Sequence, residues 1–164
     1  MRYETQFVDL QAQHTAVVRA HVAHDGIADF LGPAFGEVIA VLDEQGLHPT
    51  GAPFGKYVPA EDGGWDVEAG FPCSDVAKPS GRVEASELPG GRAARTMHVG
   101  AYGDVGAAYE SAMAWLTEEG CVMAGPPWEC YLDGPEVAEP RTEVFIPCAT
   151  AQPTGAQVSD GRSL

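Results

Sequence analysis

The sequence predicts an α+β fold in which duplicated β-α-β-β units form one antiparallel sheet, with two helices on one face and a groove between them. Two observations predict this fold. A shift of 74 residues places residues 30–57 over residues 104–131 without a gap, and nine of the twenty-six positions from Gly32 to Tyr57 are then identical. Chance would give about two. Each copy also shows the same order of strand-like and helix-like patterns, which indicates an internal duplication.

In the first copy, alternating apolar and β-branched residues predict a strand over residues 6–22. Apolar residues then recur at helical spacing from Ile27 to Leu42. Pro33 is expected in the first turn of this helix, and Gly46 is expected to cap its carboxyl end. The rest of this copy is expected to form two strands joined by a turn, near 52–59 and 65–73 with the turn at 61–64.

The second copy repeats the pattern with a strand at 92–100, a helix at 104–119 that Gly120 ends, and strands near 127–133 and 141–148. These elements match those of the first copy in order and approximate length. One small β-α-β-β unit cannot bury its helix well by itself. The two copies are therefore expected to pair about a pseudo-twofold axis and to form a ligand groove at their junction.

The domain organisation follows from the two copies. A single domain is expected over residues 1–148, made of repeats at about 3–75 and 90–148. The connector at 77–91 is rich in loop-forming residues and includes a possible short strand at 83–87. The polar segment 149–164 is expected to be a disordered tail.

The amino-acid composition indicates which kinds of binding partner and which cellular location are expected. The formal net charge is −15, with 24 acidic and nine basic residues, which argues against nucleic acid as a partner. No apolar run is long enough to span a membrane, and the first residues do not form a signal peptide. The four cysteines show no CxxC spacing, so a cytoplasmic protein with reduced thiols is expected. The sequence does not indicate an oligomeric state.

Three segments carry a resemblance to a known family. LPGGRAARTMHVGAYGDV (88–105) leads into the second helix, and GPPWECYLDGP (125–135) and RTEVFIPC (141–148) follow. In their order and spacing, residues 3–148 resemble the GyrI-like small-molecule-binding domain, which is built from SHS2-type repeats. This domain occurs alone in bacteria and as the effector-binding half of some multidrug-sensing transcription regulators. Nothing in the sequence resembles a DNA-binding segment, so the stand-alone form is expected.

The resemblance implies a groove for bulky, aromatic and often cationic compounds. Glu143 matches the acidic residue on the last strand, although it could instead face water on an edge strand. Tyr57, Trp128 and Tyr131 match the aromatic region that encloses the ligand. The two tyrosines match each other across the repeat, so symmetric core packing is an alternative role for them. Further candidates for the groove are Phe35, Phe54, Glu68 and Tyr109.

The aromatic segment GPPWECY contains two opposite faces. In a strand, Glu129 and Tyr131 point to one side, and Trp128 and Cys130 point to the other. One pair is therefore expected to serve the core, and the other the surface or the site. Residue 129 corresponds to Gly55 in the first copy, which indicates that the fold does not require Glu129.

Three functions are compatible with these residues. The leading hypothesis is a binder of hydrophobic or cationic small molecules, acting in sequestration or sensing. The alternative is a hydrolase of electrophilic strained-ring toxins, with Glu143 activating water and Tyr131 and Glu129 assisting. A DNA gyrase-modulating role is a third hypothesis, which rests on the acidic charge and the family alone.

No metal or cofactor is expected. His21 and His24 are three residues apart, and His21 matches His98 across the repeat. However, no cysteine or carboxylate stands at a recognised ligand spacing with them. No nucleotide-binding glycine motif or nucleophile elbow is present in a suitable context either.

Overall fold

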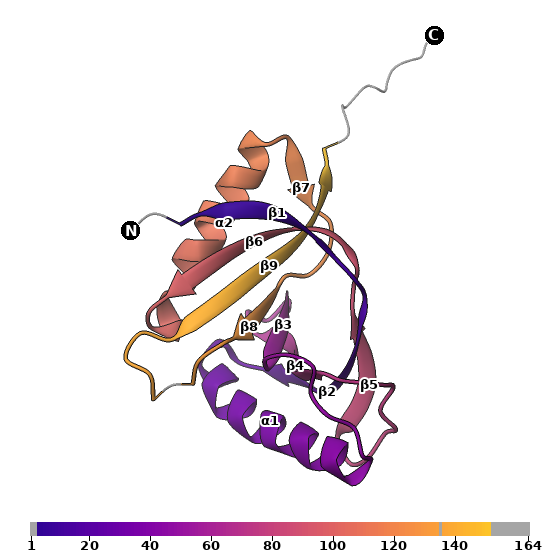
Figure 1. Cartoon of the computed structure of the whole chain (residues 1–164). Coiled ribbons are helices and arrows are strands. Elements are labelled where there is room, and N and C mark those ends of the chain that lie inside the picture. The colour runs from indigo at the N-terminus through magenta and orange to yellow at the C-terminus, as the bar shows by residue number, and fades with distance from the viewer. Residues whose placement is uncertain (1–2, 135, 152–164) are drawn as a thin grey trace.

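Within residues 3–134 and 136–151, which the computed structural model describes, the chain forms one antiparallel sheet of nine strands and two α-helices (Figure 1). The first repeat supplies β1 (Thr5–Leu10), β2 (Gln13–Val22), η1 (His24–Gly26), α1 (Ile27–Glu44), β3 (Phe54–Pro59) and β4 (Trp65–Pro72). The connector and the second repeat supply β5 (Val83–Leu88), β6 (Gly91–Val99), η2 (Tyr102–Asp104), α2 (Gly106–Glu118), β7 (Cys121–Met123), β8 (Trp128–Tyr131) and β9 (Arg141–Thr150). The α+β architecture agrees with the fold predicted from the sequence.

The strands follow the order β1-β6-β9-β8-β3-β4-β2-β5, and β7 pairs with the end of β9. The two repeats meet at the centre, where β3 pairs with β8. They also use equivalent hydrogen bonds. The Thr50 amide donates to the Pro72 carbonyl at 2.9 Å, and the matching Ala124 amide donates to the Pro147 carbonyl at 2.7 Å. Equivalent hydrogen bonds at matching positions are expected when the two repeats have the same fold.

The single strand expected over residues 6–22 is two strands, β1 and β2, which lie near opposite edges of the sheet. Only Gln11 and Ala12 separate them, and they pair with β6 and β5, which are themselves consecutive. These four strands therefore form one bent ribbon that joins the two edges of the sheet. The bend lets the face of the sheet opposite the helices enclose apolar side chains of its own.

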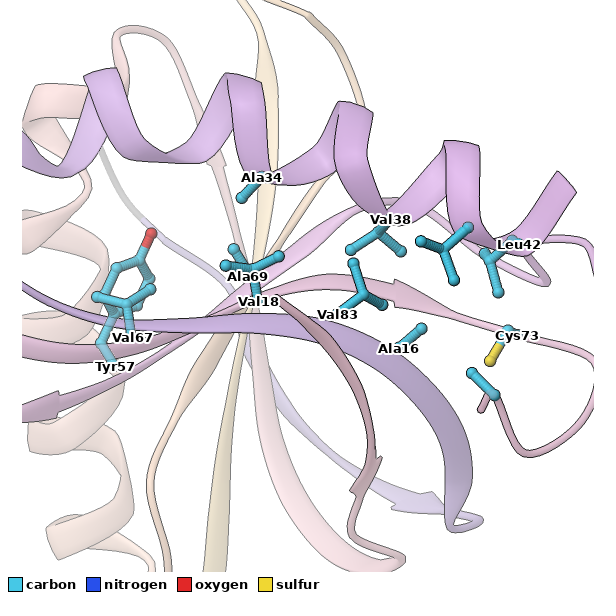
Figure 2. Packing of buried hydrophobic residues seen from close by; sticks show 12 residues of the cluster. Ala16, Val18, Ala34, Val38, Leu42, Tyr57, Val67, Ala69, Cys73 and Val83 are labelled. Atoms are coloured by element: carbon cyan, nitrogen blue, oxygen red, sulfur yellow. The ribbon is translucent and has the colours of Figure 1, made fainter. Parts of the chain in front are cut away.

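Helix α1 covers the first half of the sheet. Val38 and Leu42 point from the helix towards the strands in Figure 2, where they approach Ala16 and Val83. All four side chains are at most 2% exposed. Burying an aliphatic side chain of this size contributes about 1.5–3 kcal/mol, so this contact stabilises the packing of α1 on the sheet.

Helix α2 covers the second half on the same face of the sheet. Its buried residues are Ala108, Ala112 and Leu116, which pack against apolar side chains of β6 and β9. The strand residues in this cluster are Ala94, Val144, Ile146 and Cys148. Small alanines on the inner side of α2 allow the helix to approach the sheet closely. The position of both helices on one face agrees with the prediction.

The predicted helix ends are partly confirmed. Gly46 and Gly120 each follow the C-cap residue of their helix, Gln45 and Glu119, with φ of 72° and 75°, a backbone region that favours glycine. The amino end of α1 was predicted wrongly, because the helix begins at Ile27 and Pro33 lies inside it. Proline removes one helical hydrogen bond. Ile27 and Phe30 nevertheless pack against the core below α1, and their burial offsets this loss.

Three smaller outcomes concern the strands. The connector does hold a strand, β5, one residue longer than the expected 83–87. The short strand β7 was not predicted, since three residues carry no recognisable alternation. β9 continues to Thr150, so the first residues of the expected tail belong to the sheet, and residues 152–164 lie outside the described part of the chain.

Neither described helix combines the length and hydrophobicity that a membrane span needs.

Candidate ligand-binding site

The junction of β3 and β8 brings one tyrosine of each repeat together. Gly55 pairs with Glu129 across this junction, and Tyr57 and Tyr131 follow at matching positions of the two copies. Their hydroxyl oxygens are 2.6 Å apart, so one hydroxyl donates a hydrogen bond to the other. Both rings lie on the face of the sheet that the helices cover, because Tyr57 belongs to the core cluster below α1.

Glu129 lies at the centre of this junction and is only 9% exposed. The Tyr109 hydroxyl, from α2, donates to Glu129 Oε2 at 2.7 Å, and the Tyr131 hydroxyl donates to Oε1 at 2.9 Å. Phe35 from α1 adds an aromatic ring 6.2 Å from that of Tyr131. The two helices and the two central strands thus each contribute a side chain around one carboxylate.

The surroundings change the proton affinity of these groups. Burial raises the pKa of Glu129, and the hydrogen bonds from Tyr109 and Tyr131 oppose this rise only in part. Burial, and then the negative charge of Glu129, also raise the pKa of both tyrosines above the ordinary value. The tyrosines therefore stay protonated at neutral pH and remain hydrogen-bond donors to Glu129.

Among the described residues, no lysine or arginine forms an ion pair with Glu129. Two other partly buried glutamates differ in this respect. Glu143 is 2.5 Å from Arg95, and Glu68 is 3.0 Å from Arg19. A buried carboxylate without a lysine or arginine partner is costly for a folded protein, so a need for stability does not explain the position of Glu129.

The helices that surround Glu129 carry no positive side chain. The sequence has no lysine or arginine between Arg19 and Lys56, a stretch that includes α1, and none between Arg95 and Arg141, a stretch that includes α2. Acidic residues occur in both helices. The electrostatic field on this side of the molecule therefore attracts cations.

Gly55 explains why only one of the two repeats carries the acid. A Cβ atom at Gly55 would lie 2.6 Å from the Tyr57 hydroxyl oxygen, so any side chain there would displace the Tyr57 ring. The pseudo-symmetric position on β8 has space for Glu129. The junction consequently holds one carboxylate between two matching tyrosines.

The expectation that Glu143 faces the groove is wrong. Val144 and Ile146 on β9 pack below α2, so Glu143, which alternates with them, points to the opposite face of the sheet and pairs with Arg95 there. Glu68 is likewise on the opposite face with Arg19, since its neighbours Val67 and Ala69 pack below α1. The sequence pattern did not reveal which face each acid takes, because both faces of these strands are largely buried.

Trp128 and Phe54 also lie away from Glu129. They belong to the apolar cluster that the bent ribbon encloses on the face opposite the helices. The Trp128 ring stacks on that of Phe145, with 5.5 Å between their centroids. The predicted division of this strand into two faces is confirmed: Trp128 serves this second core, and Glu129 and Tyr131 lie on the helix side.

The structure adds Tyr102, which sequence reasoning missed. Its ring is 5.7 Å from that of Tyr131, and its hydroxyl donates to the Asp133 carbonyl at 2.5 Å. The one feature of the sequence that could have indicated Tyr102 is its place directly before the second predicted helix. Of the predicted aromatic residues, Tyr57, Tyr131, Tyr109 and Phe35 therefore gather at the carboxylate. Within the described chain, no three histidine, cysteine or acidic side chains are grouped to hold a metal ion.

A buried acid among aromatic side chains, at the junction of two repeats, is typical of a domain that binds small molecules. The chain matches the model of the GyrI-like small molecule binding domain over residues 3–149 and belongs to this family. A search of the curated proteins finds no match to the chain.

Several solved structures share the fold. The C-terminal domain of EcmrR matches with a TM-score of 0.80 and 24% identity, covering 92% of this chain and 100% of that domain. The chain covers 59% of EcmrR in an EcmrR–DNA complex, and so spans about three fifths of that protein's length. SAV2435 bound to tetraphenylphosphonium matches with a TM-score of 0.66 and 18% identity, covering 89% of this chain and 94% of that one.

A further match is a hydrolase from Listeria innocua, with a TM-score of 0.67 and 13% identity, covering 90% of this chain and 93% of that chain. All of these identities are below 25%, so the matches show a common fold.

Proposed function

We propose that this domain binds bulky hydrophobic cations at Glu129, between the two helices. The observation that carries the proposal is the buried Glu129 carboxylate, which receives two tyrosine hydrogen bonds but forms no ion pair with a lysine or arginine among the described residues. A positively charged aromatic ligand would neutralise this charge and would also contact the faces of Phe35 and Tyr131. The tetraphenylphosphonium complex of SAV2435 supports a ligand of this chemical class.

Sequestration or sensing of toxic cations is the biological role that fits such a site. The tyrosine rings enclose Glu129 without a dense set of directional hydrogen bonds to a ligand. Aromatic walls and one charge can accept many cations of different shape, which is how a site with broad specificity is built.

The test is a calorimetric titration with tetraphenylphosphonium and with tetraphenylborate, an anion of the same shape. We expect the wild type to bind the cation, and Glu129→Gln to weaken this binding at least about tenfold, since losing one partner of a buried charge pair costs about 2–5 kcal/mol. Glu110→Gln is the matched control, because Glu110 is an exposed glutamate next to Tyr109. Equal binding of the borate, or unchanged cation affinity in Glu129→Gln, would contradict the proposal.

A second candidate function is hydrolysis of electrophilic small molecules at the same carboxylate. The observation that favours it is the pairing of Glu129 with the Tyr131 hydroxyl at 2.9 Å. Glu129 would remove a proton from water, and a tyrosine hydroxyl would donate a hydrogen bond to the leaving oxygen. Mass spectrometry of recovered epoxides and other strained-ring compounds distinguishes the two functions, because only hydrolysis adds the mass of a water molecule.

A further inference from the structure

A hollow with a volume of about 400 Å³ lies apart from Glu129. Lys56 alternates with Tyr57 along β3, so its side chain extends from the face of the sheet opposite the helices. The remaining walls come from the bend between β5 and β6, the β7–β8 connection and the end of β9. The lining residues are Lys56, Pro89, Gly90, Gly91, Arg92, Ala124, Gly125, Pro126, Pro147 and Cys148.

The charge of this hollow differs from that of the chain as a whole. Its lining contains two of the nine basic residues, Lys56 and Arg92, and none of the 24 acidic residues. The rings of Pro89, Pro126 and Pro147 supply apolar surface beside these two cations. Apolar surface beside a few charged groups is the usual lining of a small-molecule site.

Both cations are only loosely paired. Lys56 Nζ is 3.7 Å from Glu68 Oε1, and Arg92 Nε is 3.6 Å from Asp9 Oδ1. Every other ion pair in the described chain is 3.0 Å or closer. Distances of 3.6 and 3.7 Å are too long for hydrogen bonds, so the two side chains keep donors available for an anion.

Lys56 is also unusual for its position. Its side chain is only 18% exposed, because it stands in the middle of a central strand, a place where lysine is uncommon. The corresponding residue of the second repeat is Cys130, which packs against the apolar cluster on that face. The fold therefore accepts an uncharged residue at this position, and burial of a lysine there is not a structural requirement.

Arg92 acts on the same hollow. Burial raises the pKa of the Cys148 thiol, and Arg92 opposes that rise. The guanidinium group is therefore within electrostatic reach of a residue that lines the hollow. Its Cζ atom is 5.2 Å from the centroid of the Phe7 ring, which restricts its orientation.

We propose that this hollow is a second binding site, specific for an organic anion that has a carboxylate group and a flat apolar body. The carboxylate pairs with Lys56 and Arg92, and the apolar body lies against the three prolines. This site is independent of Glu129 and selects ligands of the opposite charge. One domain would thus bind a cation on its helix side and an anion on the other.

The test is calorimetric titration of the full chain with 1-naphthoate and with its uncharged analogue 1-naphthamide. We expect saturable binding of the naphthoate and much weaker binding of the amide. Lys56→Gln and Arg92→Gln should each weaken naphthoate binding on the order of tenfold, because each removes a charge-assisted hydrogen bond. Lys56→Gln leaves Glu68 paired with Arg19 at 3.0 Å, so the fold should survive.

Two controls separate this site from the first. Lys78→Gln removes one positive charge at an exposed position outside the hollow and should leave naphthoate binding unchanged. Glu129→Gln should also leave it unchanged. The proposal is overturned if naphthoate does not bind, if the amide binds equally well, if Lys56→Gln and Arg92→Gln both bind naphthoate as the wild type does, or if Glu129→Gln abolishes binding.

Discussion

Replacement of Glu129 by glutamine should make the folded domain more stable at neutral pH. Glutamine has nearly the same shape, and its carbonyl oxygen can still accept a hydrogen bond from one of the two tyrosines that contact Glu129. Its amide group can donate to the other tyrosine oxygen. The variant therefore removes the cost of burying a charge without leaving a cavity.

The pH dependence gives the sign of this effect. Glu129 has a reference pKa of 4.5, and burial raises its pKa in the folded protein. Below the reference value, the side chain is protonated in both the folded and the unfolded state, and the wild type loses nothing relative to glutamine. As pH rises from the reference value to the folded pKa, the unfolded state ionises while the folded state resists ionisation, so the wild type loses stability, and the loss is complete above the folded pKa.

The magnitude is about 1.4 kcal/mol of unfolding free energy for each unit by which burial raises the pKa. Urea denaturation of wild type and Glu129→Gln, from about pH 5 to about pH 8, measures the difference directly. Glu110→Gln, an exposed control on α2, should show no such trend. The reasoning is refuted if the difference between wild type and Glu129→Gln is independent of pH, or if the wild type becomes the more stable protein as pH rises.

Two further substitutions test the placement of the side chains. Trp128→Ala should cost about 3–5 kcal/mol of unfolding free energy in urea, because Trp128 is 3% exposed. It should leave tetraphenylphosphonium affinity within about twofold of the wild type; a large affinity loss at unchanged stability would place Trp128 in the site instead. Gly55→Ala should cost about 1 kcal/mol by displacing the Tyr57 ring, because the added Cβ would also lie 2.9 Å from Tyr57 Cζ, and Tyr57→Leu in the same chain, which removes the ring, should remove most of that cost. Gly36→Ala is the control for urea denaturation, since a Cβ there meets no atom within 4 Å, and an equal cost in that variant would contradict the explanation.

The charge distribution connects the two proposed sites. Among the described residues, lysine and arginine are absent from both helices and occur on the strands and loops, including Lys56 and Arg92 at the hollow on the opposite face. Acidic residues in the helices would speed the approach of cations to Glu129, and added salt would slow it. The same separation of charge lets one small domain contain a cation site and an anion site on different faces.

Local patterns in the sequence determined much of this fold. The 74-residue repeat predicted two similar units, and glycines at positions 46 and 120 predicted the helix ends, because a positive φ is a local property of the chain. Strand alternation also predicted that Glu129 and Tyr131 share one face and that Trp128 takes the other. These results depend on backbone geometry over a few residues.

Only the tertiary structure decided which face of each strand meets the helices. Alternation separates Glu143 from Val144, but both faces of the sheet are largely buried, so the sequence pattern could not assign one of them to the site. The bent ribbon that encloses Trp128 and the contact of Tyr109 with Glu129 join residues distant in sequence. Such contacts depend on how β3 and β8 pair and how α2 packs. The sequence pattern around one residue does not indicate which distant residues it will contact.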